Sequence, residues 1–325
     1  MKDMANLPIR HDAELLDPSP LMPARLRQPG APTPANTGPV QIYDARARDL
    51  LEGARLMTLY DQAGWCEGTL WLPAERTLMW SDISGRRVLG WREDGAVDVL
   101  IDATPFINGN CRAPDGTLYH CEHGRRAISR SNGDGRLHLV ATHADGTRLN
   151  APNDIIVAPD GLIWFTDPTF GIENPSQGVP ASSESGRTAL CRIDADGVAR
   201  RVVDMVQPNG LAFSPDGRIL YVSQTPLNGE GEVAIFAFDY RDGEVANQRR
   251  FATVAKGIPD GFTVDLRGWV WSVSESGIEV FDADGGHLAT IPTPHFCSNC
   301  TFDEEEKRLF MAGRETLWML PLNAT

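Results

Sequence analysis

Five acidic or amide residues occupy the same place in a recurring sequence pattern, eight positions before the tip of a predicted hairpin turn. They are Glu67, Asn108, Asn153, Asn209 and Asp260. Carboxylate and amide oxygens are the ligands that Ca²⁺ and Mg²⁺ prefer, whereas softer metals usually recruit His or Cys. Each residue alone is also a common turn former. Five in register favour a divalent cation site, provided that the fold brings them together.

The hairpins that follow these residues form a repeat. Six segments share a template of apolar strand, turn and second apolar strand, and their starts are 38 to 56 residues apart. The segments span residues 71–82, 111–122, 156–167, 212–224, 263–274 and 301–313. Frequent Asp-Gly pairs supply tight turns between the strands. In the last segment the acid-or-amide position is looser, with Ser298 or Asn299 as candidates.

A period of this length is typical of four-stranded propeller blades. We therefore predict an all-β fold, a six-bladed β-propeller with antiparallel blades around a central tunnel. The first strand of each blade lines the tunnel, so the five positions should converge on its axis. Residues 54–62 could pair with the last blade and close the ring. A β-sandwich is the alternative, but it does not predict six matching hairpins.

The chain divides into a short arm and one large domain. Eight prolines within residues 1–40 disfavour helices and regular ladders, which predicts an extended arm or a disordered tail. Residues 41–325 are predicted to form a single propeller domain, with one short helix within residues 43–56. The oligomeric state does not follow from the sequence.

Charge and composition restrict the possible partners. The net charge of −14 argues against nucleic acid and against an anionic membrane surface. No apolar run has the length of a signal peptide or a spanning helix, so we expect a cytoplasmic protein. The six cysteines are then expected to be reduced, and the Cys297–Cys300 pair to be small buried residues rather than a redox motif.

The second strand of each hairpin should end on the face where the first strand begins, and these ends would form the mouth of the tunnel. His123 is the only histidine among them. A single histidine is more often a structural hydrogen bonder, but it could also contact substrate or move a proton. Phe170 and Trp65 could supply apolar walls. The sequence has no Gly-x-Ser-x-Gly elbow, phosphate loop or His-Glu-x-x-His motif.

Several of these motifs, in this order, resemble the senescence marker protein/gluconolactonase/regucalcin family. They are WCEGTLW, INGN, RLNAPNDIIVAPDGLIWFTDPTFGI, VQPNGLAFSPDG and IPDGFTVDLRGWVW. The resemblance covers about residues 43–323, and CEHGRRAISR is similar to the bacterial sugar-lactonase branch. It implies a six-bladed propeller that holds one divalent cation in its tunnel and hydrolyses a lactone.

The resemblance also implies individual roles. Glu67, Asn209 and Asp260 correspond to metal ligands, and Asp260 also to the general base. Asn153 corresponds to a fourth ligand or a substrate-binding group, and Asn108 to a substrate-binding residue. His123 and Phe170 are further candidates for substrate contact.

This chain departs from the family pattern in places that affect the substrate more than the metal. The first blade reads CEGTLW where EGPVW is common, and INGN lacks the usual aliphatic residue after Gly. Ala151 stands where some animal members have a substrate-binding Arg, and Arg148 lies nearby. The identity of the lactone is therefore open.

We expect hydrolysis of a sugar (aldono-) lactone, with the cation polarising the carbonyl and Asp260 accepting a proton from water. Ca²⁺ is the favoured cation, although Zn²⁺, Mg²⁺, Mn²⁺ or Fe²⁺ could replace it. The alternatives are a phosphotriesterase-like hydrolase using the same site, a non-catalytic calcium-binding propeller, and an interaction propeller without metal.

Overall fold

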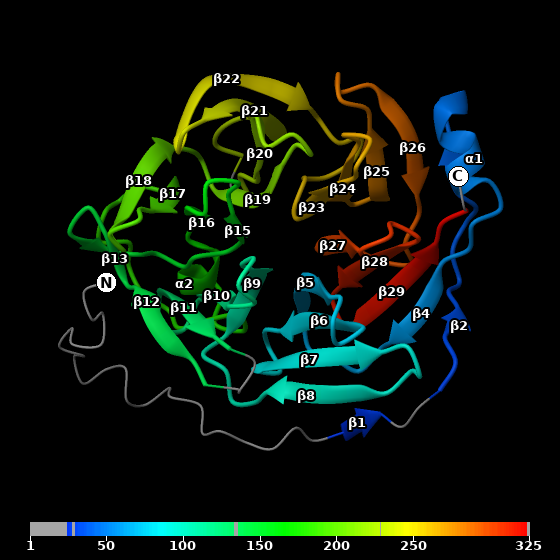
Figure 1. The fold of residues 1–325 in the computed structure, drawn as a ribbon, viewed down its shortest axis with the longest axis horizontal. Helices are drawn as coiled ribbons and strands as arrows, with labels where there is room; N and C mark the ends of the chain where they lie inside the picture. The colour runs from blue at the N-terminus through cyan, green and yellow to red at the C-terminus, as the bar shows by residue number, and fades with distance from the viewer. Residues whose placement is uncertain (1–24, 28–29, 133–135, 228, 324–325) are drawn as a thin grey trace.

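The computed structural model describes residues 25–27, 30–132, 136–227 and 229–323. Its strands form six antiparallel sheets arranged as a ring, seen along the axis in Figure 1. The predicted six-bladed β-propeller is confirmed. Each of the six hairpin segments forms the two inner strands of a blade. The first of these strands begins before the segment itself, on the side of the acid-or-amide position.

Each blade consists of four consecutive strands, except the last, which borrows one from the N-terminal region. The first three blades are β5 (Cys66–Leu72), β6 (Thr77–Asp82), β7 (Arg87–Arg92) and β8 (Val97–Ile101); β9 (Ile107–Arg112), β10 (Leu118–Glu122), β11 (Ala127–Ser131) and β12 (His138–Ala141); and β15 (Ile155–Val157), β16 (Ile163–Asp167), β17 (Ala189–Ile193) and β18 (Ala199–Asp204). The last three are β19 (Pro208–Phe213), β20 (Ile219–Gln224), β21 (Ala234–Arg241) and β22 (Glu244–Ala252); β23 (Phe262–Val264), β24 (Val270–Ser274), β25 (Gly277–Phe281) and β26 (His287–Ile291); and β27 (Asn299–Phe302), β28 (Arg308–Gly313), β29 (Thr316–Pro321) and β4 (Met57–Tyr60).

The ring is closed by strand β4, as predicted for residues 54–62. It pairs antiparallel with β29, placing Thr58 opposite Trp318 and Met57 opposite Met319. The sixth blade therefore combines strands from both ends of the propeller sequence. Because this pairing makes β4 the outer strand of the sixth blade, the chain first supplies that strand and then continues directly into β5 of the first blade.

Short strands from the proline-rich arm and from the two residues just after position 40 lie along the outer edges of three blades. β1 (Arg25–Arg27) pairs with β8, β2 (Thr33–Pro34) with β4, and β3 (Gln41–Ile42) with β26. The described part of the arm is thus extended and covers otherwise unpaired strand edges. Residues 1–24 lie outside the described residues, and the division at residue 40 stays a prediction.

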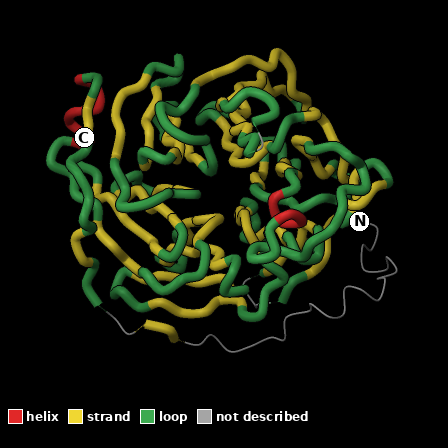
Figure 2. The backbone as a smooth tube through the Cα atoms, turned by 180° about the vertical axis from the view of Figure 1, so that it is seen from behind, coloured by secondary structure: helices red, strands yellow, loops and turns green. Residues whose placement is uncertain are grey.

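Helical structure is confined to short segments in the described residues. A 3₁₀ turn η2 (Ala45–Ala47) leads into α1 (Arg48–Leu51), which confirms the short helix expected within residues 43–56. A single turn α2 (Phe170–Glu173) lies in the segment between β16 and β17. In Figure 2, which shows the ring from behind, α2 lies beside the centre of the ring. A two-stranded hairpin, β13 (His143–Ala144) with β14 (Thr147–Arg148), joins the second and third blades.

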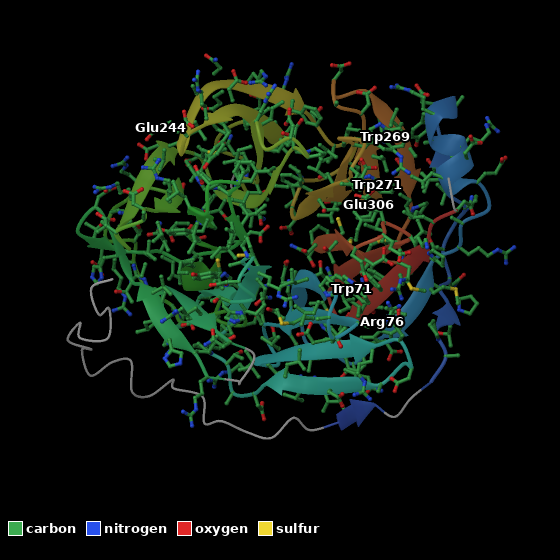
Figure 3. All side chains as sticks on the ribbon, in the orientation of Figure 1. Trp71, Arg76, Glu244, Trp269, Trp271 and Glu306 are labelled. Atoms are coloured by element: carbon green, nitrogen blue, oxygen red, sulfur yellow. The ribbon has the colours of Figure 1, made fainter. Side chains whose placement is uncertain are left out.

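Apolar packing holds the blades together. Among the described residues, the buried apolar side chains form six clusters, and each lies between two neighbouring blades. Trp71, on the first blade, stacks on Phe310 of the sixth with ring centroids 5.5 Å apart, and Trp271 of the fifth meets Phe302 of the sixth edge-on with centroids 5.3 Å apart. Both tryptophans are labelled in Figure 3. The hydrophobic effect therefore stabilises the contacts between blades and fixes their relative positions.

All six cysteines are free and buried, and Cys297 and Cys300 form no disulfide. No helix in the described part of the chain has both the length and the apolar character needed to cross a membrane.

Candidate active site

The five predicted positions lie at the start of the innermost strands. Asn153 and Asp260 lie two residues before the first residues of β15 and β23, whereas the other three lie within β5, β9 and β19. Four of the five are no more than 8% exposed, and Asp260 is half-buried. We call Glu67, Asn108, Asn153, Asn209, Asp260 and their sixth-blade counterpart the ring residues.

Backbone hydrogen bonds between blades identify that counterpart. The N–H of Gly109, the residue after Asn108, donates to the carbonyl of Asn153 at 2.8 Å. The N–H of Gly261, the residue after Asp260, donates in the same way to the carbonyl of Ser298 at 2.8 Å. Ser298, one of the two candidates, is therefore the sixth ring residue.

Glycine follows the ring residue in four of the six blades because the neighbouring backbone lies very close. A Cβ added at Gly68 would lie 2.1 Å from the carbonyl oxygen of Asn108, and one at Gly210 would lie 2.6 Å from that of Asp260. Atoms cannot approach so closely without moving the backbone. These glycines allow the inner strands to come together around the axis.

Gly109 provides a direct test of this close packing. A Cβ there would lie 2.5 Å from the carbonyl oxygen of Asn153. We expect Gly109→Ala to destabilise the protein by about 1–3 kcal/mol, because backbone would have to shift. Urea unfolding measures the change, and Gly38→Ala is the matched control, since nothing lies within 4 Å of its added Cβ. Equal stability of the two variants would contradict the assignment.

Hydroxyl groups on the second strands hold the backbone of the ring residues. Ser81, on β6, donates to the carbonyl of Asn108 at 2.7 Å. Two further bonds of the same kind run from Thr166 to the carbonyl of Asn209 at 2.7 Å and from Ser223 to that of Asp260 at 2.8 Å. These bonds cross from one blade to the next, so ring positions are set by pairs of blades.

Two ring carboxyls interact electrostatically. Burial, followed by the charge of Asp260, raises the pKa of Glu67 well above its usual range, although the indole of Trp65 donates to its Oε1 at 3.3 Å. Burial raises the pKa of Asp260 to about 7, opposed by a hydrogen bond from Asn209 and reinforced by the charge of Asp154. Because ionisation of either group is unfavourable in the protein alone, the site favours a compensating positive charge.

The chemistry of this donor set fits a hard cation. The ring presents carboxylate, amide and hydroxyl oxygens, and none of its members is His or Cys. Across the described residues, no three His, Cys, Asp or Glu side chains group together as a metal-binding cluster. A cation at this place would therefore need the amide oxygens of Asn153 and Asn209 in addition to the two carboxylates.

His123 is fully buried behind Asn108. Its Nε2 lies 3.3 Å from the side-chain nitrogen of Asn108, and its Nδ1 lies 2.9 Å from the carbonyl oxygen of Gln177. Burial lowers the pKa of His123 to about 4, so the imidazole is neutral at neutral pH. Direct substrate contact by His123 stays a prediction, and both of its nitrogens already have protein partners.

Phe170 and Trp65, the two predicted apolar walls, have different surroundings in the structure. Phe170 is half-buried and begins α2, while Trp65 is half-buried beside Glu67. Trp65 therefore combines an apolar ring with a polar contact to a ring carboxylate. Substrate contact by Phe170 stays a prediction.

The chain matches the family model described as the SMP-30/Gluconolactonase/LRE-like region over residues 65–314. It belongs to this family. The matched region contains all six ring residues but not β4 or β29. In this SMP-30/gluconolactonase family protein, the strands that close the ring and the proline-rich arm thus lie outside the region that defines the family.

Several relatives carry lactonase names. A solved structure of a gluconolactonase from Xanthomonas campestris, XC5397, is 55% identical, covers 92% of this chain and 100% of its own, and superposes with a TM-score of 0.89. The gluconolactonase of Zymomonas mobilis is 28% identical over 77% of this chain and 76% of its own length. The L-arabinolactonase of Azospirillum brasilense is 30% identical over 84% and 86%, respectively.

Two groups near the ring of this SMP-30/gluconolactonase family protein were missed by the sequence reasoning. Asp154 occupies the position that is glycine in four other blades, and burial raises its pKa to about 7. Comparing the residue after each ring position would have found it. The second group is a buried pair in which His120 Nδ1 lies 2.7 Å from Oδ1 of Asn110, whose amide donates to Gly68 and Asn108 carbonyls. No local pattern marks this pair.

Proposed function

We propose that this protein is a lactonase that hydrolyses the ester ring of a small sugar lactone, with a divalent cation at the ring residues and Asp260 as general base. The observation that carries the proposal is the interaction of two carboxyls, buried Glu67 and half-buried Asp260, within a ring that otherwise offers neutral oxygen ligands. The lactonase names of relatives that align with most of this chain support the same reaction.

The proposed cation ligands are Glu67, Asn153, Asn209 and Asp260. When bound, the cation would polarise the lactone carbonyl and favour the charge that develops on its oxygen. All four side chains offer oxygen, which favours Ca²⁺ or Mg²⁺, while Zn²⁺, Mn²⁺ and Fe²⁺ bind such sites according to availability.

Asp260 acts first as general base and then as general acid in the proposed reaction. Its carboxylate accepts a proton from water while the water oxygen forms a bond to the lactone carbonyl carbon. The C–O bond of the lactone ring then breaks, and the proton passes from Asp260 to the oxygen that leaves the carbonyl carbon. The product is an open-chain hydroxy acid. In this proposal Asn108 and Asn153 hydrogen-bond hydroxyls or the carbonyl of the lactone, and Phe170 provides an apolar contact.

A substrate panel on metal-stripped and reconstituted protein tests the proposal. We expect an aldonolactone to be opened with kcat/KM of at least about 10⁴ M⁻¹s⁻¹ once Ca²⁺ or another divalent cation is restored, and negligible turnover without it. Proton release in weakly buffered solution measures the rate. Cation binding without hydrolysis of any lactone would contradict the proposal, as would turnover of an organophosphate triester alone.

A further inference from the structure

The amide of Asn108 is held by a side chain that sequence reasoning placed at the rim. His123 follows β10 and is fully buried, with its Nε2 3.3 Å from the Nδ2 of Asn108. On the other side of the imidazole, Nδ1 lies 2.9 Å from the backbone carbonyl oxygen of Gln177. The histidine therefore bridges a ring residue and the segment between β16 and β17.

The chemistry of these two contacts determines which atoms carry hydrogen. A carbonyl oxygen only accepts, so Nδ1 of His123 must donate to Gln177. In a neutral imidazole the other nitrogen, Nε2, is then an acceptor, and the Asn108 amide donates to it through Nδ2. An amide whose nitrogen is held in this way has its Oδ1 directed away from the histidine, where it can accept a hydrogen bond.

The segment of residues 168–188 holds the imidazole at a second point. A Cβ added at Gly171 would lie 2.4 Å from Cγ of His123, so the glycine backbone packs directly against the imidazole. The same segment reaches the first blade, where Ser84 donates to the carbonyl of Ser176 at 2.9 Å. His123 thus cannot rotate freely while this segment stays in place.

We propose that His123 is a positioning residue that fixes the Asn108 amide with its Oδ1 as an acceptor for a substrate hydroxyl, and that residues 168–188 hold His123 in this role. The inference rests on the proposed lactonase function and narrows it. An acceptor at this place favours lactones that carry hydroxyl groups over unsubstituted ones, because a missing hydroxyl would leave Oδ1 without its partner.

The test compares two substrates, glucono-δ-lactone and δ-valerolactone, which lacks hydroxyl groups. We expect His123→Leu to raise KM for glucono-δ-lactone about tenfold, the effect of one hydrogen bond, with kcat changed less than about threefold. Kinetics with δ-valerolactone should change little. His123→Gln should keep KM for glucono-δ-lactone close to that of the parent protein, since the glutamine side-chain oxygen can accept a hydrogen bond from Asn108.

Two further variants distinguish positioning from general damage. Gly171→Ala changes neither His123 nor Asn108 but should displace the imidazole. We therefore expect it to raise KM for glucono-δ-lactone as His123→Leu does. Val179→Ala, in the same segment at a residue that is 44% exposed, is the matched control and should behave as the parent protein. In an Asn108→Ala background, His123→Leu should have no further effect on either substrate.

The inference would be overturned if His123→Leu raised KM equally for both substrates. It would also be overturned if the effects of His123→Leu and Asn108→Ala added independently in the double variant. If the parent protein opens neither lactone, the proposed function fails, and the inference is then judged by NMR of the imidazole nitrogens. A proton on Nδ1, together with a shift of the Asn108 side-chain amide in His123→Leu, supports positioning. A proton on Nε2 would overturn it.

Discussion

Replacement of Asp260 by Asn should lower kcat for lactone hydrolysis about 10³-fold, because a carboxamide cannot accept the proton of the attacking water. Asn keeps the size of the side chain and one oxygen, so the hydrogen bond with Asn209 and the fold should survive. Steady-state kinetics on an aldonolactone measure the loss, and cation binding followed by calorimetry shows whether the site still fills.

The matched control for this change is Asp284→Asn, which makes the same substitution at an exposed position in the same blade. Its activity should equal that of the parent protein. If Asp260→Asn kept activity within about tenfold of the parent while binding the cation normally, Asp260 would not be the general base.

Metal-free protein should lose thermal stability as the pH rises from about 4 to about 7. A carboxyl whose pKa is higher in the folded than in the unfolded chain holds its proton more tightly when folded, so folding becomes less favourable as the unfolded chain ionises. Asp260 has its pKa raised to about 7, and Glu67 is shifted in the same direction. The loss begins near the ordinary pKa of Asp and is complete above the folded value.

Calcium should reverse this loss mainly at the upper end of the range, because only ionised carboxylates attract it. We expect saturating Ca²⁺ to raise the melting temperature by roughly 5 °C at pH 8 and by much less at pH 5. Differential scanning calorimetry of metal-stripped protein measures both effects.

Glu67→Gln is the informative comparison, because Asp154 and Asp167 also have pKa values raised to about 7 and contribute their own pH dependence. The variant removes one ring charge and leaves the carboxyls of Asp154, Asp167 and Asp260 in place. Its pH profile should be flatter than that of the parent, with a smaller response to Ca²⁺. Identical profiles would show that the ring carboxyls do not govern the response.

The architecture was predictable because its signals are local and repeated. Each blade begins with a hairpin whose turn residues and apolar strands lie within about a dozen residues of one another, as in residues 156–167. The ring residues were found by the same route, since Asn153 gains meaning only from its register with Glu67 and Asp260. The approach of these two carboxyls in space then follows from closure of the ring.

What the sequence did not reveal depends on contacts between distant segments. The sequence places His123 at the mouth of the tunnel, because it does not show that residues 168–188 pack over this side chain. That segment has no counterpart in the other blades, and its sequence contains no pattern that predicts its position. The choice between Ser298 and Asn299 needed the hydrogen bond from Gly261. Asp154 was overlooked because the pattern was followed at one position per blade only.

The pairing of β4 with β29 has a consequence for how the protein is made. During synthesis, β4 leaves the ribosome early, and its partner emerges only after five blades and most of the sixth have been translated. Until then β4 lacks the neighbour on one side, and an unpaired strand edge can pair with other chains. The contact is also among the most distant in the sequence, and such contacts form slowly. Completion of the ring is therefore a late event, and the nascent chain carries an open strand edge throughout the synthesis of the blades.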